Sequence, residues 1–352
     1  MNFMKLKTLL IIFSILFISH ISYGEIKDSI PIVNNIEIKN IPEKSIKKYW
    51  LKVGSDAFNN PILIPIMIAK GKENGKVLGL TAAIHGNELN GIPVIQNLFK
   101  KIDISTLRGT IIAVPGLNTV SIFNNRRRFS DYVDLNRIFP GKKEGNTSQQ
   151  MVYNIYNKVI KLFTHHIDMH TASFGRINSM YARADLTNET LKMMADLQNP
   201  DIILASKGKP SFGSSASQTL RASAMQKGIY SITVEYGNPQ VYQPKITKRG
   251  VNGIENLMSW LGMINKTINN SKSSIICSKS SWIYANEGGL LEVTVSLTEK
   301  VKKGQLIGVI KNPFGDIVKK YFAPNDGIVI GKSTNPVSIS GGRIIHLGIL
   351  QK

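Results

Sequence analysis

Apolar and polar positions follow two spacings between residues 76 and 234. Short apolar runs of strand length alternate with stretches in which apolar residues recur at helical spacing. The pattern predicts strands over 76–84, 109–116, 167–169, 201–205 and 230–234, and helices over 89–101, 147–163, 186–197 and 215–226. Strands that alternate with helices predict a three-layer α/β domain around a mostly parallel sheet.

The pattern changes near residue 271, beyond which no helical spacing occurs. Strand-length runs separated by Gly, Pro and Asn cover 290–295, 305–310, 316–322, 327–331 and 343–350. Such a series predicts a small all-β domain of barrel or sandwich type. We therefore expect a signal peptide over 1–24, an α/β domain over 25–270 and a C-terminal β domain over 275–352.

The first residues have the pattern of a secretory signal. Lys5 and Lys7 precede the apolar run 9–18, and small residues stand near Gly24. The apolar run is shorter than the roughly 20 residues that span a membrane. We therefore expect cleavage after Gly24 and an exported protein, either periplasmic or secreted.

Composition narrows the choice of partners. Of 352 residues 42% are hydrophobic, which is enough to build a large core, and the only cysteine, Cys277, excludes an intrachain disulfide. Lys and Arg number 44 against 23 Asp and Glu, a net charge of +21. No nucleic-acid motif accompanies this charge. It therefore favours an anionic substrate or an electrostatic contact with an anionic cell envelope, although a merely solvated charge is equally compatible. The oligomeric state is not predicted.

Three possible metal ligands stand at predicted strand ends. His85 and Glu88 lie between the strand 76–84 and the next helix, and His170 directly follows the run 167–169. The carboxyl ends of parallel strands are where ligands collect in such sheets. Two imidazoles and one carboxylate leave an open position on tetrahedral zinc, which is typical of a catalytic site. The sequence thus predicts one zinc ion held by His85, Glu88 and His170.

Glu235 is the candidate general base. It follows the apolar strand 230–234, where a charged side chain is unusual and therefore indicates a functional role. A metal ion activates water and polarises a carbonyl, but hydrolysis still needs a group to move the proton. Asp168 lies on the same strand face as His170 and has either a role in holding that histidine or a purely structural one.

A basic segment supplies groups that bind anions. Arginines occupy 126–128, and Asp134-Leu-Asn-Arg137 follows. Arginine binds a carboxylate through two parallel hydrogen bonds, and a second arginine can stabilise the oxyanion of a tetrahedral intermediate. The segment therefore favours hydrolysis of an amide that lies next to a carboxylate.

Taken together, these motifs resemble the succinylglutamate desuccinylase/aspartoacylase family, a branch related to the zinc carboxypeptidases. They occur in the order of that family: AIHGNELNG at 83–91, DLNRIFPG at 134–141, IDMHT at 167–171 and VEYG at 234–237. The C-terminal segment, with GGL at 288–290, also resembles the β domain that the family appends.

The resemblance implies a zinc-carboxypeptidase-like fold and a zinc-dependent deacylase of N-acyl amino acids or related compounds. Asn136 and Arg137 match the family's contacts to the substrate carboxylate. Arg128 most nearly matches the arginine that polarises the scissile carbonyl, with the arginines of 126–127 as alternatives. Arg221, on the predicted helix before the base, is the candidate for a further substrate contact.

Two alternatives remain open. The substrate is either a small N-acyl amino acid or a peptide C-terminus, as in the stem peptides of a cell wall. In a different class, the chain is a non-catalytic protein that binds anionic envelope polymers. A lipoyl or biotinyl carrier is disfavoured, because Lys319 and Lys320 lie in a strand-like run and not at a hairpin tip.

Overall fold

A computed structural model describes residues 29–72, 75–208, 218–269 and 273–351. The chain divides into two compact units, 1–31 and 32–352, and every element named below belongs to the second. The predicted signal peptide lies outside the described residues. Among the residues that are described, no helix combines the length and the apolar character needed to cross a membrane.

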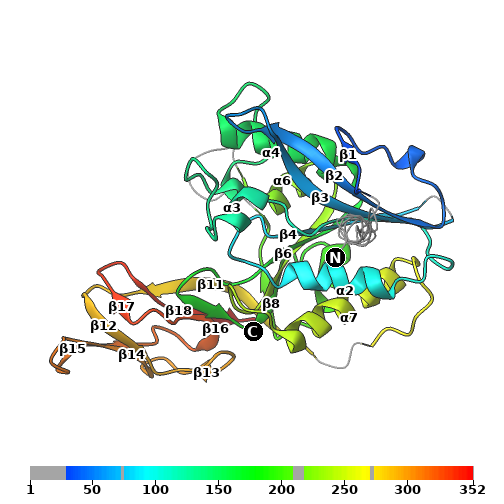
Figure 1. The fold of residues 1–352 in the computed structure, drawn as a ribbon. Helices are drawn as coiled ribbons and strands as arrows, with labels where there is room; N and C mark the ends of the chain where they lie inside the picture. Colours follow the sequence, from blue (N-terminus) through cyan, green and yellow to red (C-terminus); the bar gives the residue numbers. More distant parts are fainter. Residues whose placement is uncertain (1–28, 73–74, 209–217, 270–272, 352) are drawn as a thin grey trace, which may run out of the picture. The chain divides into compact units, whose positions relative to one another are not determined.

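A large mixed sheet organises the fold (Figure 1). Its strands, in spatial order, are β1 (Ile32–Val33), β2 (Ser45–Ser55), β3 (Pro61–Lys70), β5 (Thr110–Val114), β4 (Val77–Ala82), β6 (His165–His170), β10 (Tyr230–Tyr236), β8 (Met180–Ala184), β9 (Ile202–Ala205), β11 (Ile275–Tyr284), β18 (Arg343–Leu350), β16 (Gly327–Ser333) and β13 (Lys300–Val301). β7 (Arg176–Asn178) pairs with β16. The pairs from β5 to β10 and from β8 to β11 are parallel, as is β1–β2. The pairs β2–β3, β3–β5, β10–β8 and those beyond β11 are antiparallel. The expected α/β sheet is therefore present, and it is parallel mainly at its centre.

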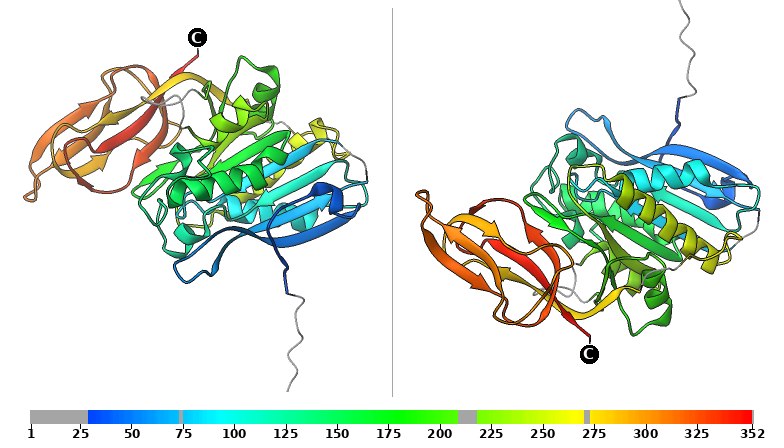
Figure 2. Two further views of the ribbon diagram at one scale, coloured as in Figure 1. Left: turned by 90° about the horizontal axis from the view of Figure 1, so that it is seen from above. Right: turned by 90° about the horizontal axis from the view of Figure 1, so that it is seen from below.

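Helices cover both faces of this sheet (Figure 2). They are α2 (Gly91–Lys101), α3 (Thr119–Phe123), α4 (Thr147–Lys158), α5 (Glu189–Asp196), α6 (Leu220–Gln226) and α7 (Pro244–Trp260), with short 3-10 helices η1 (Ile38–Asn40), η2 (Leu135–Arg137) and η3 (Ile160–Leu162). The helix expected over 147–163 is thus divided between α4 and η3. That expected over 215–226 begins outside the described residues.

Two apolar cores separate the helices from the sheet. In one, Leu98 of α2 and Leu257 of α7 pack against the central strands. In the other, Ile155 of α4 and Leu220 of α6 pack with β2 and β3. All four side chains are fully buried, and burial of one such side chain contributes about 1.5–3 kcal/mol. The two cores hold the central strand ends in a fixed arrangement.

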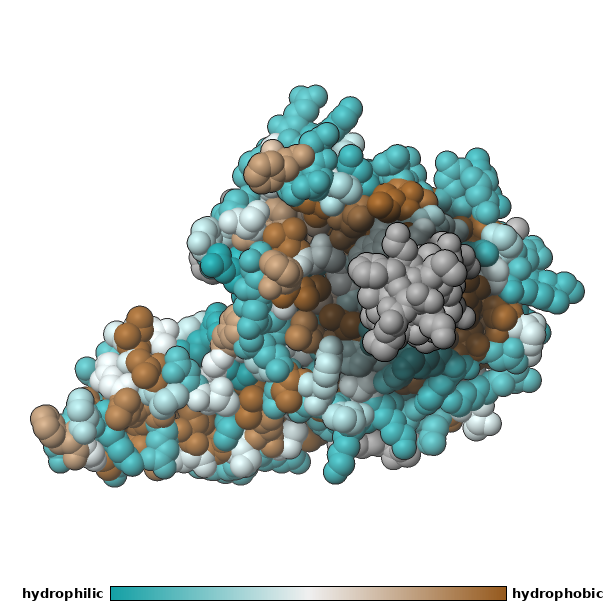
Figure 3. Space-filling view, viewed as in Figure 1, coloured by the Kyte–Doolittle hydropathy of each residue, from teal (hydrophilic) through white to brown (hydrophobic). Residues whose placement is uncertain are grey.

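Residues 275–350 form strands and no helix, as expected. β11 pairs with β9 and with β18, so the large sheet continues into this segment. A second sheet follows, with β15 (Ile317–Phe322), β14 (Leu306–Lys311), β12 (Gly289–Val293) and β17 (Val337–Ser338) in spatial order. Phe314, in the turn between β14 and β15, and Phe322 of β15 are exposed. Hydrophobic and hydrophilic residues are mixed over the surface that Figure 3 shows. The division of the chain at residue 275 stays a prediction.

Candidate active site

The loop after β4 turns sharply and carries the first two candidate ligands. Ala83 has a φ of 57°, in the left-handed region, so the chain leaves the sheet directly before His85. Only glycine fits at position 86, because a Cβ there would overlap the backbone of Ser121. Asn90 closes the loop, since its buried Nδ2 donates to the carbonyl oxygen of Tyr236 at 2.9 Å. Gly86 thus lets the loop pack against α3, and Asn90 ties it to strand β10.

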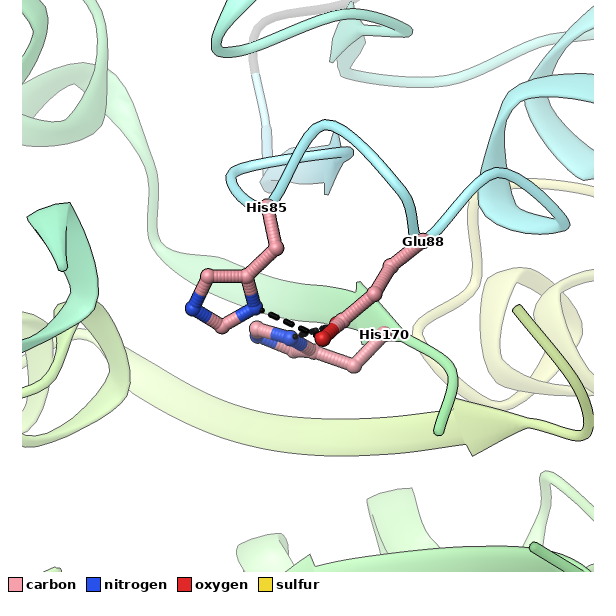
Figure 4. A group of neighbouring side chains, drawn as sticks. All are labelled: His85, Glu88 and His170. Carbon is pink, nitrogen blue, oxygen red and sulfur yellow. Dashed lines mark hydrogen bonds and ion pairs between the residues drawn. The ribbon is translucent and has the colours of Figure 1, made fainter. Parts of the chain in front are cut away.

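His85, Glu88 and His170 converge, as the sequence predicts (Figure 4). Nδ1 of His85 lies 2.9 Å from Oε1 of Glu88, and Nδ1 of His170 lies 2.8 Å from Oε2. One ligand atom from each residue falls within 4.8 Å of the others, and all three side chains are buried. The arrangement is that of three ligands around a shared point.

The opposite nitrogen of each imidazole faces a carboxylate. Nε2 of His85 lies 2.9 Å from Oδ1 of Asp134, and Nε2 of His170 lies 2.9 Å from Oδ2 of Asp168. Such a carboxylate fixes the tautomer, so that Nδ1 keeps its lone pair for a metal. Nδ1 of His85 is buried and forms no hydrogen bond, although a buried polar atom normally has a partner. The donor set therefore fits a divalent metal such as zinc.

Charge is balanced within this cluster. Burial alone would raise the pKa of Glu88, but the charges of His85 and His170 and the hydrogen bond with His170 hold it well below its usual value. Burial likewise acts to raise the pKa of Asp134, and the contact with His85 and the charge of Arg127 overcome that effect. Both carboxylates are consequently ionised at neutral pH, the form that a metal site requires.

Glu235 lies on β10, next to the strand that carries His170. The two residues are register partners, and Tyr181 of β8 is the partner of Glu235 on its other side. Asn178 donates from Nδ2 to Oε2 of Glu235 at 3.2 Å. Burial raises the pKa of Glu235; His170 opposes the shift and Glu88 adds to it. A carboxylate with a raised pKa beside a metal site has the properties of a general base.

Only one of the three successive arginines faces the cluster, and it is Arg127. Its Nη1 donates to Oε1 of Glu88 at 2.6 Å and its Nη2 to Oδ2 of Asp134 at 3.0 Å. Arg128 is exposed and does not line the pocket, so the structure does not bring the arginine favoured by the motif spacing to the site. The alternative that the sequence left open, Arg127, takes this position. The turn at Asn125, with a φ of 50°, sets which arginine points inward.

A pocket of about 380 Å³ opens above these groups. Asn136, Arg137 and Arg221 line it, so all three residues expected to contact substrate reach the site. Its guanidinium groups come from Arg127, Arg137, Arg176, Arg183, Arg221 and Arg343, against the carboxylates of Glu88 and Glu235. The pocket is therefore built to receive an anion.

Asn136 and Arg221 also hold the pocket together. Oδ1 of Asn136 accepts the N–H of Leu220 at 2.8 Å, which ties η2 to the start of α6. Arg221 is buried and donates to the carbonyl oxygen of Ser206 at 2.9 Å. Burial and the nearby charge of Arg183 lower the pKa of Arg221 to about 10, so the group stays cationic at neutral pH.

One side of the pocket, formed by strands β11 and β18, was not predicted from the sequence. Trp282 of β11 and His346 of β18 are register partners whose rings stack 5.1 Å apart, and Arg343 precedes them at the start of β18. These residues lie far along the chain from the motifs that supply His85, Asn136, His170 and Glu235. Only the pairing of β11 with β18 brings them to the site, and no local pattern reports that pairing.

His165 and His166 do not belong to the site. Both are buried at the start of β6, where His166 contacts the hydroxyls of Thr81 and Ser231. Burial lowers the pKa of each to about 4. Both are therefore neutral residues within the sheet.

The sequence of residues 74–261 matches the succinylglutamate desuccinylase/aspartoacylase catalytic domain. One relative, the N-alpha-acetyl-L-2,4-diaminobutyric acid deacetylase of Halomonas elongata, is 23% identical over 81% of this chain and 84% of its own. A succinylglutamate desuccinylase of Pseudomonas aeruginosa is 31% identical, but over 30% of this chain and 33% of its own length. Both names denote hydrolases of amide bonds, which confirms the expected class of enzyme.

Solved structures share the fold. A succinylglutamate desuccinylase/aspartoacylase from Rhodobacter sphaeroides superposes with a TM-score of 0.79 at 21% identity, over 91% of this chain and 99% of that one. The product-bound ectoine utilization protein EutE (DoeB) from Ruegeria pomeroyi gives a TM-score of 0.78 at 18% identity, over 88% and 98%. The match of the catalytic domain covers more than half of the sequence, and the predicted motifs meet in one pocket. The chain therefore belongs to the succinylglutamate desuccinylase/aspartoacylase family.

Proposed function

We propose that the chain is a zinc-dependent amidohydrolase that removes the acyl group from an N-acyl amino acid or a similar amide with a carboxylate. The observation that carries the proposal is the convergence of His85, Glu88 and His170 at the floor of a pocket lined by arginines. The metal donors supply the chemistry of hydrolysis, and the guanidinium groups supply the affinity for an anion. Names of relatives in the family agree with this class of reaction.

His85, Glu88 and His170 would hold the zinc ion. When bound, the ion polarises the amide carbonyl and lowers the pKa of water. Asp134 and Asp168 hold the two imidazoles through Nε2, so that Nδ1 of each points to the shared position. Because these carboxylates are fixed before substrate arrives, the ligands need no reorganisation during the reaction.

Glu235 acts as the general base and then as the acid. It accepts a proton from the attacking water and delivers it to the amide nitrogen, which leaves as an amine. The hydrogen bond from Asn178 orients the carboxylate toward the pocket. Its raised pKa brings the carboxylate closer to the pH at which it must both accept and release a proton.

The arginines of the pocket have two different roles in the proposed reaction. Arg127 stabilises negative charge on the carbonyl oxygen, a role that its place beside Glu88 supports. Arg137 and Arg221, with Asn136 between them in the lining, bind the substrate carboxylate. The predicted contact through Arg128 is not proposed further, because that side chain is exposed outside the pocket.

A panel of amides tests this function. Zinc-loaded protein is offered N-acyl amino acids with a free carboxylate and the same compounds with that carboxylate converted to a primary amide. We expect hydrolysis of the first set and a loss of at least about tenfold for the second, since a charge-assisted contact is removed. Absence of hydrolysis of every compound, or indifference to the carboxylate, would contradict the proposal.

We also propose that the protein is exported. The support is the basic and apolar pattern of residues 5–18 followed by Gly24. Expression of the full chain in a bacterial host, followed by N-terminal sequencing of the mature protein, tests this. A mature chain that begins at Glu25 in the exported fraction agrees with the proposal, and an unprocessed chain in the cytoplasm would overturn it.

A further inference from the structure

A second pocket adjoins the first on the side of the C-terminal strands. It has a volume of about 350 Å³. We call it the outer pocket, and we call the pocket lined by His85, Glu88 and His170 the inner pocket. Its lining combines exposed apolar side chains, including Phe174, Tyr284 and Val337, with polar groups of Ser333 and Asn335. A lining of this mixed kind suits a chain that has both apolar side chains and hydrogen-bonding amides.

Two arginines connect the pockets. Arg176 and Arg343 line both the inner and the outer one, so the pockets meet at these side chains. The guanidinium groups lie 5.9 Å and 5.2 Å from the centre of the Trp282 ring. Neither group forms an ion pair with any residue that the structure describes. Two cations held beside one indole without a carboxylate make a place for an anion.

Like charges lie close to Arg176, and Glu88 and Glu235 offset them only in part. Burial lowers the pKa of Arg176, and the like charges of Arg343 and Arg127 lower it further. Stacking of His346 on Trp282 at an interplanar angle of 11° holds the indole in place. The two arginines are thus positioned by a packed wall, and not by the flexibility of a surface loop.

The pair differs in position from the groups proposed to bind the substrate carboxylate. Arg176 and Arg343 line both pockets, whereas Arg137 and Arg221 line only the inner one. If Arg221 and Arg137 bind the carboxylate on the amine side of the amide, the acyl side points toward Arg176 and Arg343. This step rests on the function proposed above.

We propose that the acyl part of the substrate is a peptidyl chain with an anionic group, which passes between Arg176 and Arg343 and continues into the outer pocket. A peptidyl group is an acyl group, so the same chemistry then releases a C-terminal amino acid. Water adds OH to the carbonyl carbon and hydrogen to the nitrogen as the C–N bond breaks. The products are a peptide carboxylate and a free amino acid.

Three substrates with the same C-terminal residue test the inference. They are the N-acetyl amino acid, an acetylated tripeptide with two Glu before that residue, and its counterpart with two Gln. We expect kcat/KM to be highest for the acidic tripeptide, by roughly tenfold over the neutral one, the effect of one ionic contact. Equal or better hydrolysis of the N-acetyl amino acid, or equal rates for the two peptides, would overturn the inference.

Variants locate the effect. Arg343→Gln should lower kcat/KM for the acidic tripeptide by roughly tenfold more than for the neutral tripeptide, because the contact with its anionic group is removed. Val337→Trp, which crowds the outer pocket, should act in the same direction. Lys319→Gln, an exposed charge on β15, is the matched control and should change neither rate. An equal loss for all substrates in Arg343→Gln contradicts the assignment.

A binding measurement separates this inference from the proposed function. Calorimetry of the acidic tripeptide with Glu235→Gln protein needs no turnover. Binding that is weakened by Arg343→Gln in the same background supports the outer pocket even if no amide is hydrolysed, which would then overturn only the proposed reaction. Hydrolysis of N-acyl amino acids without any binding of the tripeptide would overturn only the outer pocket.

Discussion

Asp134→Asn isolates the contribution of one carboxylate to metal binding. Asp134 contacts Nε2 of His85 at 2.9 Å and Nη2 of Arg127 at 3.0 Å, and its side chain is 16% exposed. Asparagine has the same shape and keeps an oxygen for the backbone N–H of Asn136, which Asp134 accepts at 3.0 Å. The substitution therefore removes the negative charge beside His85 and replaces the oxygen that accepts from Arg127 with an NH2 group, while it retains the local turn.

Loss of such a partner weakens a metal site by about 10- to 100-fold. That range corresponds to about 1.4–2.7 kcal/mol. The smaller value is expected if Arg127, which still contacts Glu88 at 2.6 Å, keeps the cluster in place. The assay is competition for zinc with a chelator of known affinity, followed at constant pH. The control is Asp326→Asn, which removes an exposed contact with Lys302. Unchanged zinc affinity in Asp134→Asn, or an equal change in the control, would refute the reasoning.

Three further substitutions test other parts of the site. Glu235→Gln should lower kcat by about 10²–10⁴-fold with zinc retained. In the unaltered protein, activity should fall as the pH drops through the raised pKa of Glu235. A pH–rate profile of the unaltered protein without this acid limb would contradict the role of Glu235 as base. Arg127→Gln should lower kcat by about 10²–10³-fold. The same substitution at the exposed neighbour, Arg128→Gln, should leave kcat within about twofold. Equal effects of the two substitutions in steady-state kinetics would contradict the role given to Arg127. Asn90→Ala removes the hydrogen bond to Tyr236 and should lower the free energy of unfolding by about 1–3 kcal/mol in urea denaturation; a change below about 0.3 kcal/mol would show that the loop does not depend on it.

The sequence was sufficient for the centre of the site. His85, His170 and Glu235 each follow a short apolar run, and parallel strands place such positions at one edge of a sheet. Strand limits were accurate where turn formers bound them, as for β18 over Arg343–Leu350. The apolar cores on both faces of the sheet follow from the alternation of apolar strand runs with helices whose apolar residues recur at helical spacing.

Other features depend on contacts that local pattern does not encode. Whether Arg127 or Arg128 faces His85, Glu88 and His170 depends on the backbone turn at Asn125, which changes the direction of each successive side chain. The wall formed by Trp282 and His346 depends on the register of two strands separated by many residues. A period of two identifies a strand but not its partner, and so the arginines of the outer pocket were outside the reach of sequence reasoning.

The most direct test of the account is the zinc content of the purified protein beside that of a His85→Ala, His170→Ala double variant, with hydrolysis of an N-acyl amino acid measured on both. We expect about one zinc per chain in the unaltered protein and none in the double variant, since three ligands hold a catalytic site. It also predicts that hydrolysis stops on chelation and returns with zinc. Hydrolysis by metal-free protein, or equal zinc binding by the double variant, would contradict the central claim.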